Sequence, residues 1–174
     1  VAVGDIVIFG PEDDTIRTGI ISEVSQRHNY IVRVSPHNRN QKHIIAANID
    51  LALLVASIAD PRTSMGFIDR FLITAEAYHI PAILVVNKTD LLKAKHVKTL
   101  ERWQELYVGA GYEVYPVSAK NVHTLNALEA RIKDKITLFS GHSGVGKSTL
   151  INQFIPGIEL KTKEVSDWSG KGQH

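Results

Sequence analysis

The chain has 174 residues, of which 44% are hydrophobic, and a formal net charge of +2. This size fits one full globular domain, or one domain with a small module, and the near-neutral charge points to no class of partner. There is no cysteine, which excludes disulfide bonds and thiolate metal sites within these residues. No apolar run is long enough to cross a membrane and no signal peptide follows Val1, so we expect a cytoplasmic protein. Because Val1 is not a natural start, we also expect a fragment of a longer protein.

Residues 1 to 47 have the pattern of short strands separated by turns. We expect strands at 3–9, 17–24, 30–34 and 42–47, with glycine, proline, aspartate and asparagine in the turns between them. Short strands at this spacing are typical of a small β-barrel such as an OB-fold. The first strand of such a barrel would lie upstream, so we expect an incomplete OB-like barrel at 1–47.

The middle of this β-rich part is basic. Between residues 24 and 49 there is no acidic residue, and four cationic side chains fall there: Arg27, Arg33, Arg39 and Lys42. Such a surface can bind RNA phosphates, but it can equally be a solvated basic loop, since only Tyr30 offers a nearby ring for base stacking. The three histidines of the stretch are more typical of polar loop residues than of a metal site, because no carboxylate or cysteine accompanies them.

From residue 48 onward, apolar strands alternate with helices. We expect buried strands at 49–55, 82–86, 113–117 and 136–139. Helical patterns lie between them: one opens at Pro61 and Thr63, one follows Asp90 with Val97 on its apolar side, and one is capped by Thr124. This alternation predicts an α/β fold with a mainly parallel sheet, right-handed crossovers and ligand-binding loops at the carboxyl ends of the strands.

A glycine-rich loop joins the last of these strands to a helix. It has the pattern G-x-x-x-x-G-K-S and comprises Gly141, His142, Ser143, Gly144, Val145, Gly146, Lys147, Ser148 and Thr149. Its backbone N–H groups and the positive helix end would hold phosphates, with Lys147 on the β and γ phosphates, Ser148 on Mg²⁺ and Thr149 on the α phosphate. Lys147 and Ser148 are therefore the candidate catalytic residues. The loop alone predicts a nucleoside triphosphate, and ATP-dependent kinases share it.

The loop after the strand at 82–86 indicates which base the nucleotide carries. Its residues Asn87, Lys88, Thr89 and Asp90 spell N-K-x-D, which resembles the guanine-reading motif of GTPases. The Asp90 carboxylate can accept hydrogen bonds from N1–H and the 2-amino group of guanine, a pair of donors that adenine lacks, so the wrong base leaves it unpaired. Asn87 would brace the loop and contact the base edge, while the stem of Lys88 would pack on the ring. The alternative is that Asp90 merely caps the following helix.

A third short motif follows the next strand. Ser118, Ala119 and Lys120 resemble the S-A-K motif in which a backbone N–H, here that of Ala119, meets the 6-oxo group of guanine. In ordinary GTPases the phosphate loop precedes both guanine motifs, whereas here it follows them. This order predicts a circularly permuted GTPase domain at 48–174, in which the strand at 136–139 lies beside the strand at 49–55.

With a small barrel in front of N-K-x-D, the whole chain resembles the RsgA/YjeQ family of small-subunit ribosome biogenesis GTPases. The segment Phe67-Ile68-Asp69-Arg70-Phe71-Leu72 and the terminal G-x-G-Q-H support the resemblance. It implies a monomeric, ribosome-stimulated GTPase whose barrel binds ribosomal RNA and which acts late in small-subunit assembly. The family's D-x-P-G motif and its zinc domain are absent, so zinc is expected only outside this chain. The D-x-x-G at 167–170 is interpreted as a decoy, since no buried strand precedes it.

Three functions therefore stay open. The first is GTP hydrolysis during small-subunit assembly, weak in this chain alone because both switch motifs would lie beyond His174. The second is a GTP-regulated RNA-binding module with negligible hydrolysis, and the third is an ATP-dependent kinase. No residue stands out as the activator of the attacking water. His142 lies in the phosphate loop, but we interpret it as a solvent-exposed loop residue without a catalytic role.

Overall fold

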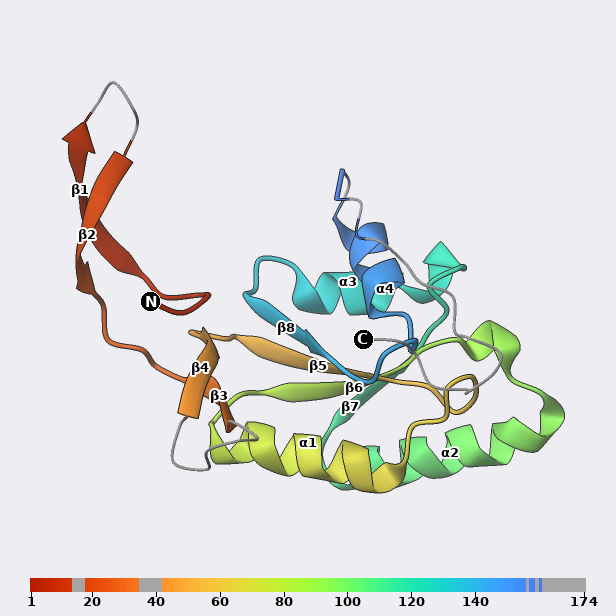
Figure 1. Ribbon diagram of the computed structural model, residues 1–174. Helices are drawn as coiled ribbons and strands as arrows, with labels where there is room; N and C mark the ends of the chain where they lie inside the picture. The colour runs from red at the N-terminus through yellow and green to blue at the C-terminus, as the bar shows by residue number, and fades with distance from the viewer. Residues whose placement is uncertain (14–17, 35–41, 156, 159, 161–174) are drawn as a thin grey trace.

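The computed structural model describes residues 1–13, 18–34, 42–155, 157–158 and 160. Its centre is a sheet of four parallel strands in the order β7-β6-β5-β8 (Figure 1). These strands are β5 (Leu51–Ala56), β6 (Ala82–Val86), β7 (Glu113–Pro116) and β8 (Thr137–Ser140). β8 pairs in parallel with β5, from Leu51 opposite Thr137 to Leu54 opposite Ser140. The predicted α/β fold and the juxtaposition expected from the motif order are both confirmed.

Helices cover both faces of this sheet (Figure 1). They are α1 (Met65–Ala77), α2 (Ala94–Gly109), α3 (Asn126–Ile132) and α4 (Lys147–Phe154). The buried side chains of β5 alternate between the faces, as strand geometry requires. One face packs with α1 and α2 in a cluster that includes Leu54, Leu84, Ile68 and Trp103.

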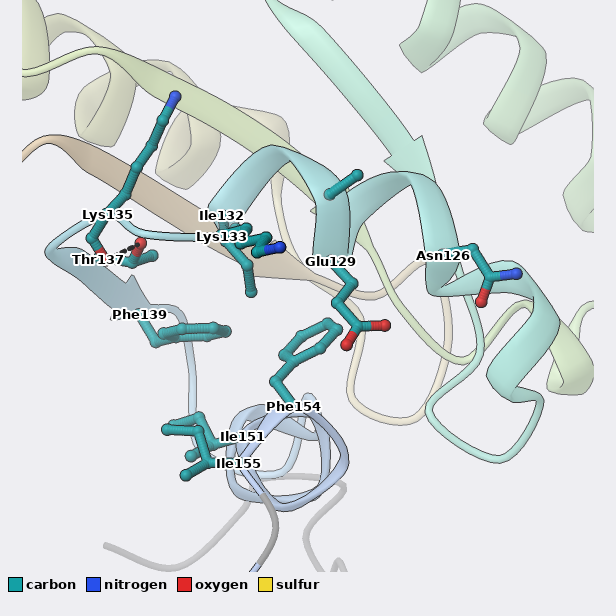
Figure 2. A pocket seen from close by; sticks show the side chains of 11 residues that line it. Asn126, Glu129, Ile132, Lys133, Lys135, Thr137, Phe139, Ile151, Phe154 and Ile155 are labelled. Atoms are coloured by element: carbon teal, nitrogen blue, oxygen red, sulfur yellow. Dashed lines mark hydrogen bonds between the residues drawn. The ribbon is translucent and has the colours of Figure 1, made fainter.

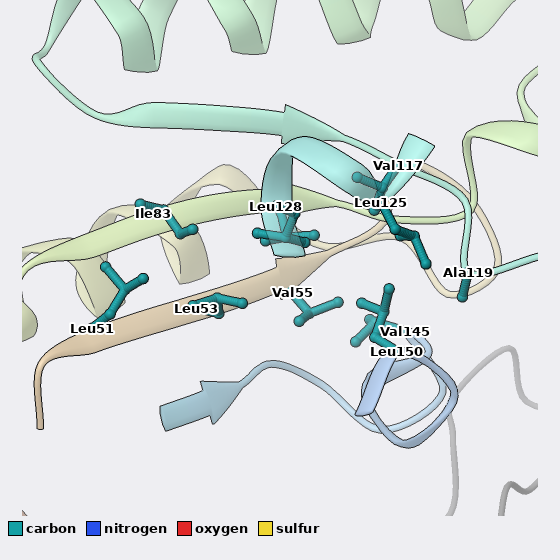
Figure 3. Packing of buried hydrophobic residues seen from close by; sticks show 11 residues of the cluster. Leu51, Leu53, Val55, Ile83, Val117, Ala119, Leu125, Leu128, Val145 and Leu150 are labelled. Atoms are coloured by element: carbon teal, nitrogen blue, oxygen red, sulfur yellow. The ribbon is translucent and has the colours of Figure 1, made fainter. Parts of the chain in front are cut away.

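The opposite face forms the core beneath the glycine-rich loop. Leu51, Leu53 and Val55 of β5 pack there with residues of α3 and α4 (Figure 3). Val145, which belongs to the loop itself, is fully buried in this cluster. The loop is therefore fixed to the sheet by hydrophobic packing as well as by its ends.

Three helix predictions need correction. α1 begins after Ser64, whose hydroxyl accepts the Phe67 N–H at 3.3 Å, while Thr63 closes the preceding loop by accepting the Ser57 N–H at 3.0 Å. Thr124 does not cap α3: it ends a short 3₁₀ helix, η2 (Val122–Thr124), and its hydroxyl accepts the Ser118 N–H at 2.9 Å. Val97 is 46% exposed, because the buried side of α2 is formed by residues nearer its carboxyl end.

The first 47 residues contain the expected antiparallel strands, but no closed barrel forms among the described residues. β1 (Val7–Asp13) pairs only with β2 (Thr18–Val24), and β3 (Tyr30–Val34) only with β4 (Lys42–Ala47). The β1–β2 pair projects away from the sheet (Figure 1). A barrel needs every strand to have two neighbours, and these pairs share none. The division at residue 47 stays a prediction.

Candidate functional site

The three loops predicted from the sequence follow β6, β7 and β8 and meet at the carboxyl ends of the strands, across β5. The buried side chain of Asn87, 1% exposed, joins them. Its Nδ2 donates to the Val145 carbonyl of the glycine-rich loop at 2.9 Å, and its Oδ1 accepts the Ala119 N–H at 3.1 Å. A side chain at Gly146, whose φ is 96°, would overlap this Nδ2. Asn87 is therefore a brace between all three loops.

The Asn87 bonds revise one predicted role. Ala119 was expected to offer its N–H to a guanine oxygen, but that N–H already donates to Asn87. A base oxygen at this position must share the N–H with Asn87 or displace it. Asn87 likewise has protein partners on both of its polar atoms, which favours bracing over contact with the base edge.

Asp90 is held on one side and open on the other. Its Oδ1 accepts the Ser118 hydroxyl at 2.6 Å, and the residue is otherwise exposed. The Ser118 oxygen in turn accepts the Lys120 N–H at 3.2 Å. Asp90 lies inside the 3₁₀ turn η1 (Thr89–Leu91), and α2 starts later with Lys93 as its cap, so the alternative that Asp90 caps this helix is wrong. A fixed, exposed carboxylate is what base recognition requires.

Lys88 links the same loop to the segment between β5 and α1. Its backbone has a positive φ of 65°, and its Nζ donates to the Asp60 carbonyl. Burial lowers the pKa of this ammonium group. The contact ties the N-K-x-D loop to the segment that follows β5.

The glycine-rich loop is fixed at its start and its end. A side chain at Gly141, whose φ is 142°, would overlap the Val55 carbonyl, so only glycine allows the loop to approach β5 this closely. After the buried Val145, helix α4 starts at Lys147 and directs its positive end toward the loop. The loop has the geometry of an anion site at a helix terminus.

Lys147 is folded back onto this loop. Its Nζ donates to the carbonyls of Gly141 at 2.8 Å and His142 at 2.7 Å. Burial lowers the pKa of the ammonium group. To reach a phosphate, Lys147 must exchange these carbonyl oxygens for phosphate oxygens. Ser148 and Thr149 follow in the first turn of α4, both half-buried.

Sequence reasoning missed two residues near the site. The ring of Phe67, from α1, stacks on the imidazole of His142 with centroids 3.8 Å apart and an angle of 30° between the planes. Thr124 closes the Ser118 loop through its hydroxyl. No spacing rule connects residue 67 with residue 142. Thr124 could have been found from the turn chemistry of the segment after Lys120.

The predicted RNA-contacting residues Arg27, Arg33 and Lys42 belong to the β-rich part of the chain. Arg27 forms an ion pair with Asp5, with Nε 2.6 Å from Oδ1, and it also donates from Nη2 to Oδ2 at 2.8 Å. In the β3–β4 pair, the backbone of Arg33 lies opposite His43 and that of Lys42 lies opposite Val34. Arg39, the 167–170 stretch and the terminal G-x-G-Q-H lie outside the described residues.

A separate pocket of about 710 Å³ lies between α3, β8 and α4 (Figure 2). Phe139, Ile151 and Phe154 supply apolar walls, and Lys133 and Glu129 lie at its edge. It includes none of the predicted nucleotide-binding residues. The site is therefore defined by its loops and not by this cavity.

Comparison with known proteins agrees with the order of these loops. A family model described as RsgA GTPase matches residues 24–174. The chain belongs to the RsgA GTPase family. A relative from Bacteroides thetaiotaomicron, named small ribosomal subunit biogenesis GTPase RsgA 2, is 47% identical over 176 residues. An RsgA relative from Christiangramia forsetii is 44% identical over 175 residues.

Solved RsgA-like structures share the fold. The crystal structure of YjeQ from Thermotoga maritima superposes with a TM-score of 0.76 at 34% identity, over 94% of this chain and 54% of that one. The structure of YloQ, described as a circularly permuted GTPase, gives 0.67 at 36% identity, over 86% and 48%. This chain also covers 56% of both RsgA relatives, so it spans about half the length of the proteins it matches.

Proposed function

We propose that this chain is the nucleotide-binding part of a GTPase that hydrolyses GTP to GDP and phosphate while acting in the assembly of the small ribosomal subunit. The observation that carries the proposal is the Asn87 brace, which holds the N-K-x-D, S-A-K and glycine-rich loops at one edge of the sheet. The names of the relatives support the biological role.

Guanine recognition is assigned to Asp90, with Lys88 and Thr89 forming the loop around it. Ser118 occupies one carboxylate oxygen of Asp90, which leaves the other free to accept from N1–H and the 2-amino group of guanine. Ala119 offers its N–H to the 6-oxo group, shared with Asn87, and Lys120 closes the loop through its own N–H. Adenine would leave the carboxylate without its two donors.

The phosphates are assigned to the loop at 141–149. Lys147 neutralises the β and γ phosphates, and the N–H groups of the loop and of the first turn of α4 hold their oxygens. The Ser148 hydroxyl fits Mg²⁺ as a single oxygen ligand, the usual protein contribution when the nucleotide supplies phosphate oxygens. In the described part of the chain, no group of three histidine, aspartate or glutamate residues could hold a metal ion by itself. Bound Mg²⁺ would neutralise charge that develops on the phosphates.

The partner is proposed to be the ribosomal RNA of the small subunit, bound by the β-rich part through Arg33, Arg39 and Lys42. Arg27 is the weakest of the four candidates, because Asp5 already neutralises it. The proposed protein acts as a monomer in the cytoplasm, where small subunits are assembled. Among the residues with assigned positions, no helix combines the length and apolar character needed to span a bilayer.

Asp90→Asn tests the base assignment. The amide replaces an acceptor by a donor, so it should disfavour the 2-amino group of guanine and favour the 2-oxo group of xanthine. We expect GTP affinity to fall by at least about tenfold and affinity for xanthosine triphosphate to rise. Asp134→Asn, the same change at an exposed position away from the loops, should leave both unchanged. Equal GTP binding by Asp90→Asn and the unaltered chain would remove the carboxylate from base recognition, and equal affinity for GTP and ATP would favour the kinase alternative.

GTP turnover by the full-length protein, with and without purified small subunits, tests the reaction. Stimulation by the subunits is expected, because catalysis of phosphoryl transfer depends on positioning that a partner can complete. Turnover that stays at the spontaneous rate under both conditions, with GTP still bound, would favour the GTP-regulated RNA-binding module.

A further inference from the structure

We propose that Phe67 is a positioning residue for the phosphate-binding loop: its ring, stacked on His142, fixes the loop segment whose carbonyls hold Lys147 in the nucleotide-free state. The inference rests on the proposed nucleotide function of this loop. It gives a role to the helix α1 segment that begins at Phe67 and to a histidine that lies inside the glycine-rich pattern. Neither Phe67 nor the His142 ring touches the predicted base-binding residues in any interaction described above.

The Phe67 ring is itself held firmly. Ser64 caps α1 by accepting the Phe67 N–H, which places Phe67 in the first turn of the helix. Its partly buried ring packs against the hydrophobic cluster between the sheet, α1 and α2. The ring is thus anchored in the core on one side and meets His142 on the other, with 3.8 Å between ring centroids.

His142 lies in the loop between two positions that the sheet and Asn87 hold in place. Gly141 is pressed against the Val55 carbonyl, and Val145 is buried and bonded to Asn87. His142 itself is exposed, and the ring stack ties its side chain to the body of the protein. Its carbonyl accepts from Lys147 at 2.7 Å. A rotation at His142 would move the very oxygen that holds the lysine.

This arrangement has a consequence for phosphate binding. Lys147 must leave the Gly141 and His142 carbonyls when it reaches a phosphate, and the loop must keep its shape while it does so. A loop that is already ordered loses less conformational freedom on binding than one that must be ordered by the ligand. Removing the flat ring of Phe67 should therefore weaken nucleotide binding through His142, without any direct contact between Phe67 and nucleotide.

The test compares Phe67→Leu with two reference variants. Phe67→Tyr keeps the ring, and Phe71→Leu makes the same change one turn further along α1, where the side chain packs into the core away from the loop. In the nucleotide-free chain, the imidazole protons of His142 should show an upfield ring-current shift by NMR. The shift should persist in Phe67→Tyr and Phe71→Leu and disappear in Phe67→Leu.

GDP titrations then measure the functional effect. We expect Phe67→Leu to bind GDP about threefold to tenfold more weakly, the range that an aromatic pair contributes, and both reference variants to bind it as the unaltered chain does. On a His142→Ala background, Phe67→Leu should have no further effect, because the stack is already lost. Thermal unfolding without nucleotide separates a loss of overall stability from a loss of affinity.

Two results would overturn the inference. One is unchanged GDP affinity in Phe67→Leu; the other is the same loss of affinity whether or not His142 is present, which would assign Phe67 a general packing role. Failure of the proposed function gives a different result: the unaltered chain would not bind GDP at all, while the His142 ring-current shift, measured without nucleotide, would still be present.

Discussion

At the scale of single residues, the site depends on one buried amide. Asn87 accepts an N–H from one loop at 3.1 Å and donates to a carbonyl of another at 2.9 Å. Buried polar groups that lose such a partner cannot turn to water, so the cost of removing Asn87 exceeds the value of an ordinary hydrogen bond. Base recognition and phosphate recognition therefore both depend on the Asn87 side chain, whose polar atoms already have protein partners.

Asn87→Ala should lower the free energy of unfolding by about 2 to 4 kcal/mol, because it leaves the Ala119 N–H and the Val145 carbonyl without partners. Urea unfolding measures the change. Asn126→Ala, at an exposed position on α3, should stay within about 0.5 kcal/mol of the unaltered chain. A similar small change for both variants would show that the two loops do not depend on the brace.

The residues of the three loops were predictable, but the bonds between them were only partly so. N-K-x-D and S-A-K identify Asp90 and Ala119 because base chemistry restricts the residue types. Two of the bonds depend on distances between loops that are remote in sequence. They are the bond from the Ser118 hydroxyl that orients Asp90 and the competing bond from the Ala119 N–H to Asn87. The Phe67–His142 stack has no local pattern, since two ordinary residues meet only after α1 has packed.

At the scale of elements, the first turn of the chain is tied to β4 by both backbone and charge. The Ala47 N–H donates to the Val3 carbonyl at 2.9 Å, and Gly4, with φ of 87°, lies where any side chain would overlap the Ala47 carbonyl. Asp5 pairs with Arg27 close by. The bond from Arg27 and, after it, the N–H of Ala2 hold the pKa of the Asp5 carboxyl well below its usual range.

This contact should be sensitive to acid. A carboxyl group whose pKa is lowered by folding stabilises the fold above its unfolded pKa of about 3.9, and that stabilisation is lost as the pH falls below this value toward the folded pKa. We therefore expect the Ala47 amide to be protected from hydrogen exchange between pH 5 and pH 7 and to lose protection below about pH 4. In Asp5→Asn, protection at pH 7 should already be reduced and should not change over the same range.

The Val85 amide, in the central strand β6, serves as the reference for global unfolding. Loss of protection at Ala47 alone is the expected result. If both amides lose protection together, acid acts on the whole fold and the Asp5–Arg27 pair has no local role.

Elements with a continuous apolar pattern were the most predictable. β6, β3 and β4 have the bounds expected from the sequence, and β6 owes this to burial on both faces, which requires a continuous apolar run. β1 spans Val7–Asp13, four residues later at both ends than the expected 3–9, and it includes Pro11 in its pairing with Gly19. Barrel closure could not be derived, since it depends on which strand pairs meet, and Phe9 on β1 remains 69% exposed.

At the scale of the whole molecule, the sheet is completed late in the chain. The Asp50 N–H donates to the Ile136 carbonyl at 2.9 Å, and the Asp50 carboxylate accepts the Ile136 N–H at 2.8 Å, across 86 positions of sequence. The order of the motifs was sufficient to predict that β8 pairs with β5. A GTPase domain can have its chain termini at a new position only if the same strands still pair in the sheet. No sequence motif pointed to the pocket beside β8, so it was not predicted.

The position of β8 beside β5 also determines how the molecule responds to force. The residues before Leu51 enter β5 at its amino end, while the chain leaves β8 at its carboxyl end, through the glycine-rich loop and α4. Tension between these two flanks pulls two neighbouring parallel strands in opposite directions along their length. Their evenly spaced hydrogen bonds are then loaded in shear and must break together, not one after another. The phosphate-binding loop lies on this load path, so single-molecule pulling should show an unfolding force that rises when nucleotide is bound.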